Sequence, residues 1–277
     1  MTYATTVDGT RKLRLDDVDP GDHGDLTPEA AEDQFDVLSK ELRELQGLMF
    51  AGKASGLLVV LQGMDAAGKD VTIQNVFLLA NPEAIRVKHF GQMTDEEEKH
   101  HFIWRADVES PARGEVVIFD RSYYEQLVLP QVEGEISDED LEVRVEDVIA
   151  FERLLLHGGI LVEKFFLHVS RDEQERRLWE RMDREPWLAS ARDWKARREW
   201  DRYMAAYEHT MSATATLEAP WHIVSADHQW YHNLSVAEAL AERLRSHKEA
   251  WTEARDRHGA TKRAEAEEEA PAGKGRN

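Results

Sequence analysis

The stretch Leu57–Asp70, LLVVLQGMDAAGKD, decides the fold of this chain, because an apolar run leads directly into a glycine-bounded loop that ends in Gly68-Lys69. Glycines at Gly63 and Gly68 allow backbone N–H groups to turn inward around anionic oxygens, and the helix that follows presents its positive end there. Lys69 adds a point charge. The stretch therefore predicts a phosphate-binding loop rather than an ordinary glycine-rich turn, with Gly63, Ala66, Ala67, Gly68, Lys69 and Asp70 as its phosphate-contacting residues.

Carboxylates near this loop suggest a magnesium site. Asp70 stands where the usual pattern has a Ser or Thr that holds magnesium, and Asp65, inside the loop, is placed to supply the missing ligand. The apolar run Val116–Phe119 ends in Asp120, an arrangement that places an acid beside a phosphate loop. Arg121 follows and can fork onto phosphate oxygens at the carboxyl ends of the strands. We therefore predict Mg²⁺ on Asp65 and Asp120.

Composition limits the class of protein. The 277 residues, 42% of them hydrophobic, can bury one substantial core, and no apolar run approaches the roughly 20 residues that span a bilayer. The acidic N-terminus lacks a signal-peptide core, so we expect a soluble, cytoplasmic protein without a membrane partner. The absence of cysteine excludes disulfides and a thiolate nucleophile, and the net charge of −20 argues against a nucleic-acid partner.

Apolar runs and helical patterns alternate along the chain, which predicts an α/β fold: a three-layer αβα, doubly wound parallel sheet with helices on both faces. Residues 1–26 are expected to form an N-terminal arm, 27–254 the domain that carries the phosphate loop and 255–277 a disordered tail. The first helix should begin at the Thr27-Pro28 cap and end near Gly52. The further strands predicted are Ile85–Phe90, Val116–Phe119, Phe165–Val169 and Trp221–Val224.

A long helical region, 171–215, interrupts the rhythm of strands and is predicted to be a lid. Its arginines and acids balance, which is typical of a solvated helix with pairs at i,i+4 spacing. Arg177, Arg181 and Arg184 nevertheless share one helical face. A mobile arginine that closes onto a phosphoryl group lowers the transfer barrier, so we predict Arg181 to be catalytic and Arg177 to contact phosphate.

Several further segments make the chain resemble the polyphosphate kinase 2 family, whose members move phosphoryl groups between inorganic polyphosphate and nucleotides. The resemblance covers about Leu26 to Leu244 and rests on GMDAAGKD, HHFIWR, FDRSYYE, WDRYMAAYE and APWHIVSADHQWY. It implies a P-loop kinase-like fold, Mg²⁺ on Asp65 and Asp120, and phosphate on Lys69. It also implies a lid over a polyphosphate channel, AMP or ADP as the acceptor, and a homodimer or homotetramer.

The chain departs from the family pattern at three places where a cation is usual: Gly91, Gln131 and the shortened segment Arg184–Leu188. Each lost cation removes a charge-assisted contact of about 1.5–3 kcal/mol, which bears on the length of polyphosphate that the channel holds. Two alternatives stay open at this point. One is a nucleotide or small-molecule kinase that uses a nucleoside triphosphate, and the other is a noncatalytic phosphate-sensing protein on the same fold.

Overall fold

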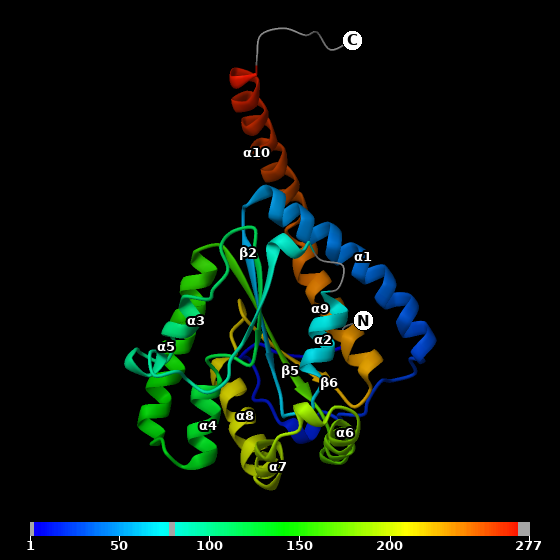
Figure 1. Ribbon diagram of the computed structural model, residues 1–277, viewed down its shortest axis with the longest axis vertical. Coiled ribbons are helices and arrows are strands. Elements are labelled where there is room, and N and C mark those ends of the chain that lie inside the picture. Colours follow the sequence, from blue (N-terminus) through cyan, green and yellow to red (C-terminus); the bar gives the residue numbers. More distant parts are fainter. Residues whose placement is uncertain (1–2, 78–80, 271–277) are drawn as a thin grey trace.

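The computed structural model of the protein describes residues 3–77 and 81–270. At its centre lies a mixed sheet with the strand order β1-β6-β5-β2-β4-β3, in which β2 to β6 run parallel. The strands are β1 (Thr5–Val7), β2 (Gly56–Gln62), β3 (Ile85–His89), β4 (Val116–Asp120), β5 (Ile160–His168) and β6 (Trp221–Ser225). Helices cover both faces of the sheet, which confirms the predicted three-layer α/β fold (Figure 1).

The helices divide into two outer layers and a lid (Figure 1). One layer comprises α1 (Pro28–Gly52), α2 (Lys69–Val76) and α9 (Gln229–Arg245), with α10 (Lys248–Glu269) projecting from it. The other comprises α3 (Trp104–Asp107), α4 (Glu125–Glu133), α5 (Asp138–His157) and α8 (Trp200–Thr214). The lid region adds α6 (Arg171–Arg184) and α7 (Ala191–Arg198), which lie at the lower end of the molecule beside α8. None of the described helices combines the length and apolarity needed to cross a bilayer.

The cap signals at the start of α1 act as the sequence predicts. Thr27 is the N-cap, and its hydroxyl oxygen accepts a hydrogen bond from the N–H of Ala30 at 3.3 Å, while Pro28 occupies the first helical position. The helix ends at Gly52, and Lys53 adopts a left-handed conformation with φ of +47°. The apolar positions of α1 face inward and pack against α9 and α10.

Strand β5 begins five residues before its predicted start. The prediction began at Phe165, because Glu163 and Lys164 broke the apolar run, whereas the strand begins at Ile160 and is buried along its whole length. The ammonium of Lys164 lies 2.8 Å from the carboxylate of Glu152 on α5, so a partner on another element makes its burial tolerable. A tertiary ion pair of this kind has no local signal in the sequence.

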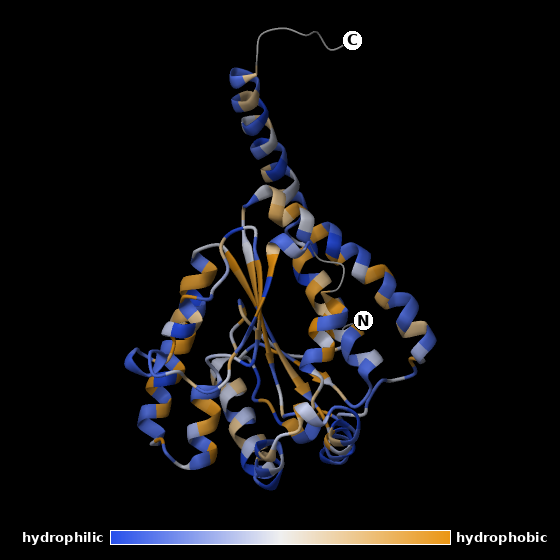
Figure 2. Ribbon diagram, in the orientation of Figure 1, coloured by the Kyte–Doolittle hydropathy of each residue, from blue (hydrophilic) through white to orange (hydrophobic). Residues whose placement is uncertain are grey.

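Both ends of the chain hold more regular structure than predicted. Part of the N-terminal arm forms β1, which pairs antiparallel with β6, so the sheet is not wholly parallel. Helix α10 replaces the predicted disorder of residues 255–269, while residues 271–277 lie outside the described part of the chain. Only Trp251 and Ala254 of α10 are buried, and Figure 2 shows its outer turns as mostly hydrophilic. Ion pairs such as Lys262–Glu265 at 2.7 Å and good helix formers account for the extension.

Candidate active site

The phosphate loop connects β2 to α2 through backbone conformations that favour glycine. Gly63 has a φ of +146° and Gly68 a φ of +107°. A Cβ atom on Gly63 would lie 2.8 Å from the carbonyl oxygen of Leu167, and one on Gly68 would lie 2.7 Å from Cε1 of His232. Ala66 also has a left-handed φ, of +62°. The loop is therefore held in a shape that few other residues could adopt at these positions.

Lys69 lies inside this loop, where the sequence predicts it. Its ammonium donates hydrogen bonds of 3.1 Å to the carbonyl oxygens of Gly63 and Met64. The side chain is buried, and burial lowers the pKa of Lys69, with the nearby cation Arg121 acting in the same direction. A bound phosphate would add negative charge at this point and stabilise the protonated ammonium.

Asp65 follows β2 and Asp120 ends β4, and both line one hollow at the carboxyl ends of these strands. Asp120 Oδ2 lies 2.8 Å from Nδ1 of His89, at the end of the neighbouring strand β3. Its other oxygen, Oδ1, is buried and has no hydrogen-bond partner among the described residues. Asp65 accepts a hydrogen bond from the guanidinium of Arg121. Burial alone would lower the pKa of Arg121, but Glu125 and Asp65 outweigh it and raise that pKa, so the side chain stays charged.

The two carboxylates fit the requirements of magnesium. The unpartnered Oδ1 of Asp120 is a hard oxygen donor, and Asp65 lines the same hollow. Within residues 3–77 and 81–270, no group of three or more His, Asp or Glu side chains is arranged to hold a metal ion. Magnesium often binds through one or two carboxylates and completes its shell with water and substrate phosphates, so a site of two carboxylates is sufficient.

A hollow of about 260 Å³ opens in front of the loop. Its lining comprises Asp65, Ala66, Gly68, Lys69, Asp70, His89, Asp120, Arg121, Arg181 and Leu188. All five residues predicted to be catalytic are in this set. Arg121 also lines a larger, polar hollow of about 470 Å³, formed by the segment after β3, by α4 and by Arg192 of the lid. The site is therefore two hollows that meet at one arginine.

Arg181 reaches the smaller hollow from α6. Its guanidinium lies 3.2 Å from the carboxylate of Asp193 on α7, a residue that the sequence analysis did not single out. Burial raises the pKa of Asp193, and the negative charge of Asp65 raises it further. Through its contact with Arg181, Asp193 links the two lid helices and fixes the direction of the guanidinium. An incoming phosphate could take the place of the Asp193 carboxylate at Arg181.

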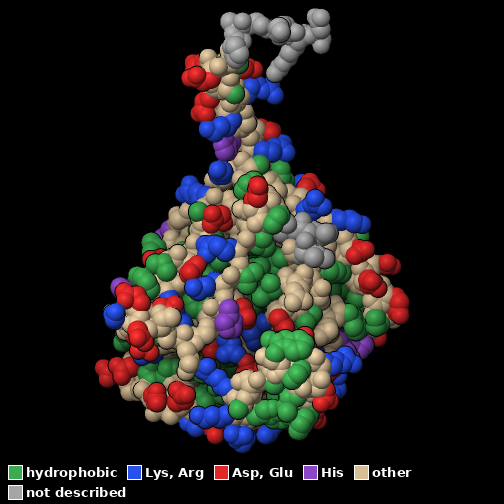
Figure 3. Space-filling view, in the orientation of Figure 1, with side chains coloured by type: hydrophobic (Ala, Val, Ile, Leu, Met, Phe, Trp, Pro, Cys, Tyr) green, Lys and Arg blue, Asp and Glu red, His purple; other side chains and the backbone are tan. Residues whose placement is uncertain are grey.

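The lid also carries exposed apolar side chains next to these charges. Figure 3 shows hydrophobic side chains gathered at the lower end of the molecule, over the lid. The large exposed hydrophobic residues of this region are Trp179, Met182, Trp187 and Leu188, and Trp187 is 74% exposed. Leu188 is the member that lines the hollow, so the lid offers both a cation and an apolar edge to a ligand.

The prediction that Arg177 contacts phosphate is wrong, because its side chain does not line the hollow. Its five N–H groups donate to Glu173 (2.7 Å) and to the carbonyls of Ala66 (3.2 Å), Ala67 (3.0 Å), Ala226 (2.7 Å) and Asp227 (2.8 Å). A guanidinium has five donors, so none is left for phosphate. The shared helical face of Arg177 and Arg181 could not reveal this, because the acceptors come from two distant loops.

The positions that lack the family's usual cations have other roles. Gln131 links α4 to α8, since its amide donates to Thr210 Oγ1 at 3.0 Å and its carbonyl oxygen lies 2.9 Å from His209. The carbonyl of Gly91 accepts a 3.0 Å hydrogen bond from Arg105, which also lines the larger hollow. A cation is therefore present beside Gly91, but it comes from α3. The signal that could have identified it is the Trp104-Arg105 element of the family resemblance.

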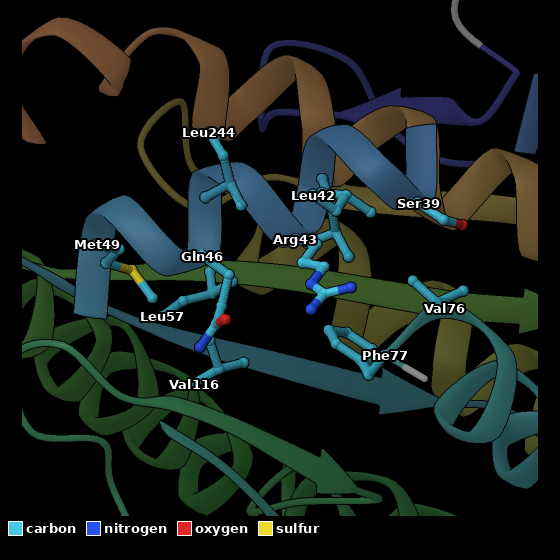
Figure 4. Close-up of a pocket in the computed structure, with 11 residues that line it drawn as sticks. Ser39, Leu42, Arg43, Gln46, Met49, Leu57, Val76, Phe77, Val116 and Leu244 are labelled. Carbon is cyan, nitrogen blue, oxygen red and sulfur yellow. The ribbon is translucent and has the colours of Figure 1, made fainter. Parts of the chain in front are cut away.

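An apolar cavity elsewhere in the fold does not compete with this site. It lies between α1 and the start of β2 and β4, where Gln46 and Met49 of α1 lie beside Leu57 and Val116 (Figure 4). Its volume of about 30 Å³ is close to that of one water molecule. It also lies at the amino ends of the strands, whereas open α/β sheets bind ligands at the carboxyl ends. We interpret it as a packing gap.

Comparison with known proteins identifies the family of this chain. A profile of the family described as polyphosphate kinase 2 matches residues 25–251. This chain belongs to the polyphosphate kinase 2 family. An AMP/ADP-polyphosphate phosphotransferase of Meiothermus ruber is 39% identical over 244 residues, covering 87% of this chain and 91% of the relative. An ADP-polyphosphate phosphotransferase of Rhodopseudomonas palustris is 35% identical and covers 77% and 79%.

A solved structure supports the assignment to the polyphosphate kinase 2 family. The crystal structure of polyphosphate kinase 2 from Arthrobacter aurescens matches with a TM-score of 0.81 and 35% sequence identity, covering 84% of this chain and 86% of that one. The match extends over most of both chains, so it includes the sheet and not the loop alone. Membership of this kinase family identifies the protein as a phosphotransferase and confirms the resemblance drawn from the sequence motifs.

Proposed function

We propose that the protein transfers phosphoryl groups between inorganic polyphosphate and AMP or ADP in a magnesium-dependent reaction. The observation that carries the proposal is the pair of hollows that meet at Arg121. The smaller one has the phosphate loop and suits the end of a phosphate chain, while the larger polar one suits a nucleotide. The names of the relatives favour AMP and ADP as the acceptors.

Five charged residues of the site have roles in direct, in-line transfer without a covalent enzyme intermediate. Lys69 and the loop N–H groups hold the donor phosphate, and Arg121 lies between donor and acceptor. Arg181 enters from the lid and neutralises charge that develops on the transferred group. When bound, Mg²⁺ on Asp65 and Asp120 would neutralise phosphate oxygens. His89 positions Asp120, since its ring nitrogen lies 2.8 Å from that carboxylate.

The test is an assay that offers AMP, ADP and GDP with either polyphosphate or ATP as the donor, with Mg²⁺ or with EDTA. We expect turnover of AMP or ADP with polyphosphate, and loss of turnover in EDTA. Transfer from ATP but not from polyphosphate would show a nucleoside-triphosphate-dependent kinase instead. Binding of polyphosphate without transfer to any acceptor would show a phosphate-sensing protein.

Asp120→Asn tests the metal assignment. The substitution keeps the size of the side chain but removes its charge, so we expect kcat to fall about a hundredfold or more at ordinary Mg²⁺, a loss typical of an electrostatic contact to the transition state. Asp33→Asn, an exposed change on α1, is the matched control and should retain activity. Full activity of Asp120→Asn in limiting Mg²⁺ would contradict the assignment.

A further inference from the structure

The backbone carbonyls of the phosphate loop accept hydrogen bonds from three side chains, Lys69 within the loop and Gln174 and Arg177 of α6 behind it. Lys69 binds the carbonyls of Gly63 and Met64. From α6, Gln174 Nε2 donates to the carbonyl of Asp65 at 3.0 Å, and Arg177 donates to the next two carbonyls, those of Ala66 and Ala67. Five consecutive carbonyls, of residues 63–67, thus point toward side-chain donors.

This arrangement decides where the loop N–H groups point. In a peptide unit the C=O of one residue and the N–H of the next point in opposite directions. The α6 side chains that hold the carbonyls of Asp65 and Ala67 therefore turn the N–H groups of Ala66 and Gly68 toward the hollow, while the N–H of Ala67 donates to the carbonyl of Met64 at 3.1 Å. The left-handed backbone of Ala66 is strained and persists only if its surroundings fix it. Arg177 supplies that fixation, because its guanidinium binds the carbonyl of Ala66 directly.

Arg177 is itself held rigidly. Its side chain is 8% exposed, and its second terminal nitrogen donates to the carbonyls of Ala226 and Asp227, in the turn between β6 and α9. Asp227 also accepts a hydrogen bond from the N–H of Ser170, the N-cap of α6, at 2.7 Å. The start of α6, the phosphate loop and this turn therefore form one hydrogen-bonded unit.

Lys69 holds two loop carbonyls and keeps one donor for the substrate. An ammonium has three donors, and two of them go to Gly63 and Met64. The contacts from Gln174 and Arg177 are on the other side of the loop and stay intact when phosphate binds.

We propose that Arg177, assisted by Gln174, is a positioning residue that keeps the phosphate loop in its binding shape before the substrate arrives. The first turns of α6 then belong to the fixed base of the site, and Arg181, one turn further along, belongs to the part of the lid that meets the substrate. The catalytic consequence rests on the proposed function, but the effect on the loop does not.

Hydrogen exchange of the full-length protein, followed by mass spectrometry, tests the proposal. In Arg177→Lys the charge is kept, but a single ammonium cannot replace the planar fork across four carbonyls. We expect exchange in a peptide covering residues 63–70 to become about tenfold faster or more, and the affinity for inorganic tripolyphosphate to fall by a similar factor, as a loss of loop preorganisation predicts. Arg176→Lys, whose side chain is 60% exposed, is the matched control and should change neither.

The outcomes separate the two roles that Arg177 could have. If Arg177→Lys left loop exchange unchanged but weakened tripolyphosphate binding, Arg177 would contact phosphate directly and the proposal would be overturned. If neither loop exchange nor tripolyphosphate affinity changed, the proposal would be overturned as well. If Arg177→Lys does not fold, Gln174→Met removes only the contact to Asp65 and should speed exchange of the same peptide to a smaller extent. Exchange is read without turnover, so a protein inactive with polyphosphate would refute the proposed function while leaving this test intact.

Discussion

Replacing Gly68 by alanine tests how closely the phosphate loop is built around a missing side chain. Gly68 ends the loop with a φ of +107°, which L-residues rarely adopt. An added Cβ would lie 2.7 Å from Cε1 of His232, 3.4 Å from its Nε2 and 3.6 Å from its Nδ1. His232 is fully buried, so its ring has no free space into which it could move.

Two costs combine in Gly68→Ala. The left-handed backbone should cost about 1–3 kcal/mol, and forcing a methyl group against a buried ring should cost about 1–3 kcal/mol more. The expected loss in the free energy of unfolding is therefore about 2–6 kcal/mol, which lowers the melting temperature of a chain of this size by on the order of 10 °C. Phosphate binding should weaken as well, because the loop shifts.

Urea and thermal denaturation, followed by circular dichroism, measure the effect. Gly24→Ala is the matched control: Gly24 also has a positive φ, of +55°, but no atom lies within 4 Å of the added Cβ. It should show the backbone cost alone. The double variant Gly68→Ala, His232→Ala should recover the steric part of the loss. If Gly68→Ala were no less stable than Gly24→Ala, or if the double variant recovered nothing, the packing argument would be wrong.

Two further predictions concern charge. Lys69→Ala should raise the activation free energy by about 2.7–4 kcal/mol, and so lower kcat, with a smaller effect on the KM for the nucleotide. If steady-state kinetics showed a rise in KM alone, Lys69 would be a plain binding contact. His232 should make stability depend on pH, since burial and the charge of Arg177 lower its pKa from 6.5 to about 3. Between pH 6.5 and 4 the unfolded chain binds a proton that the folded protein does not, so this group lowers stability by about 1.4 kcal/mol per pH unit as the pH falls. Urea titrations should show that slope reduced in His232→Ala, and an unchanged slope would contradict a neutral buried ring.

Features that rest on local patterns could be predicted from the amino-acid sequence. The run Leu57–Asp70 contains a buried strand, both glycines and the lysine of the phosphate loop within fourteen residues, so no distant contact is needed to recognise it. The cap at Thr27 and the strand that ends in Asp120 are local in the same way. The alternation of apolar runs and helical patterns along the chain predicted the parallel sheet. Because the carboxyl ends of parallel strands meet at one edge, the sheet places Asp65, Lys69, Asp120 and Arg121 there.

Features whose partners are far apart in the chain became visible in the folded structure. Lys164 could join β5 because Glu152 is buried beside it, and Asp193 was assigned to the site by its contact with Arg181. Arg177 shows the limit most clearly. Its helical position placed it with Arg181, but its hydrogen bonds go to carbonyls about 110 and 50 residues away in the chain. Periodicity gives the face of a helix on which a side chain lies, whereas the acceptors that it meets depend on how the distant loops pack against that face.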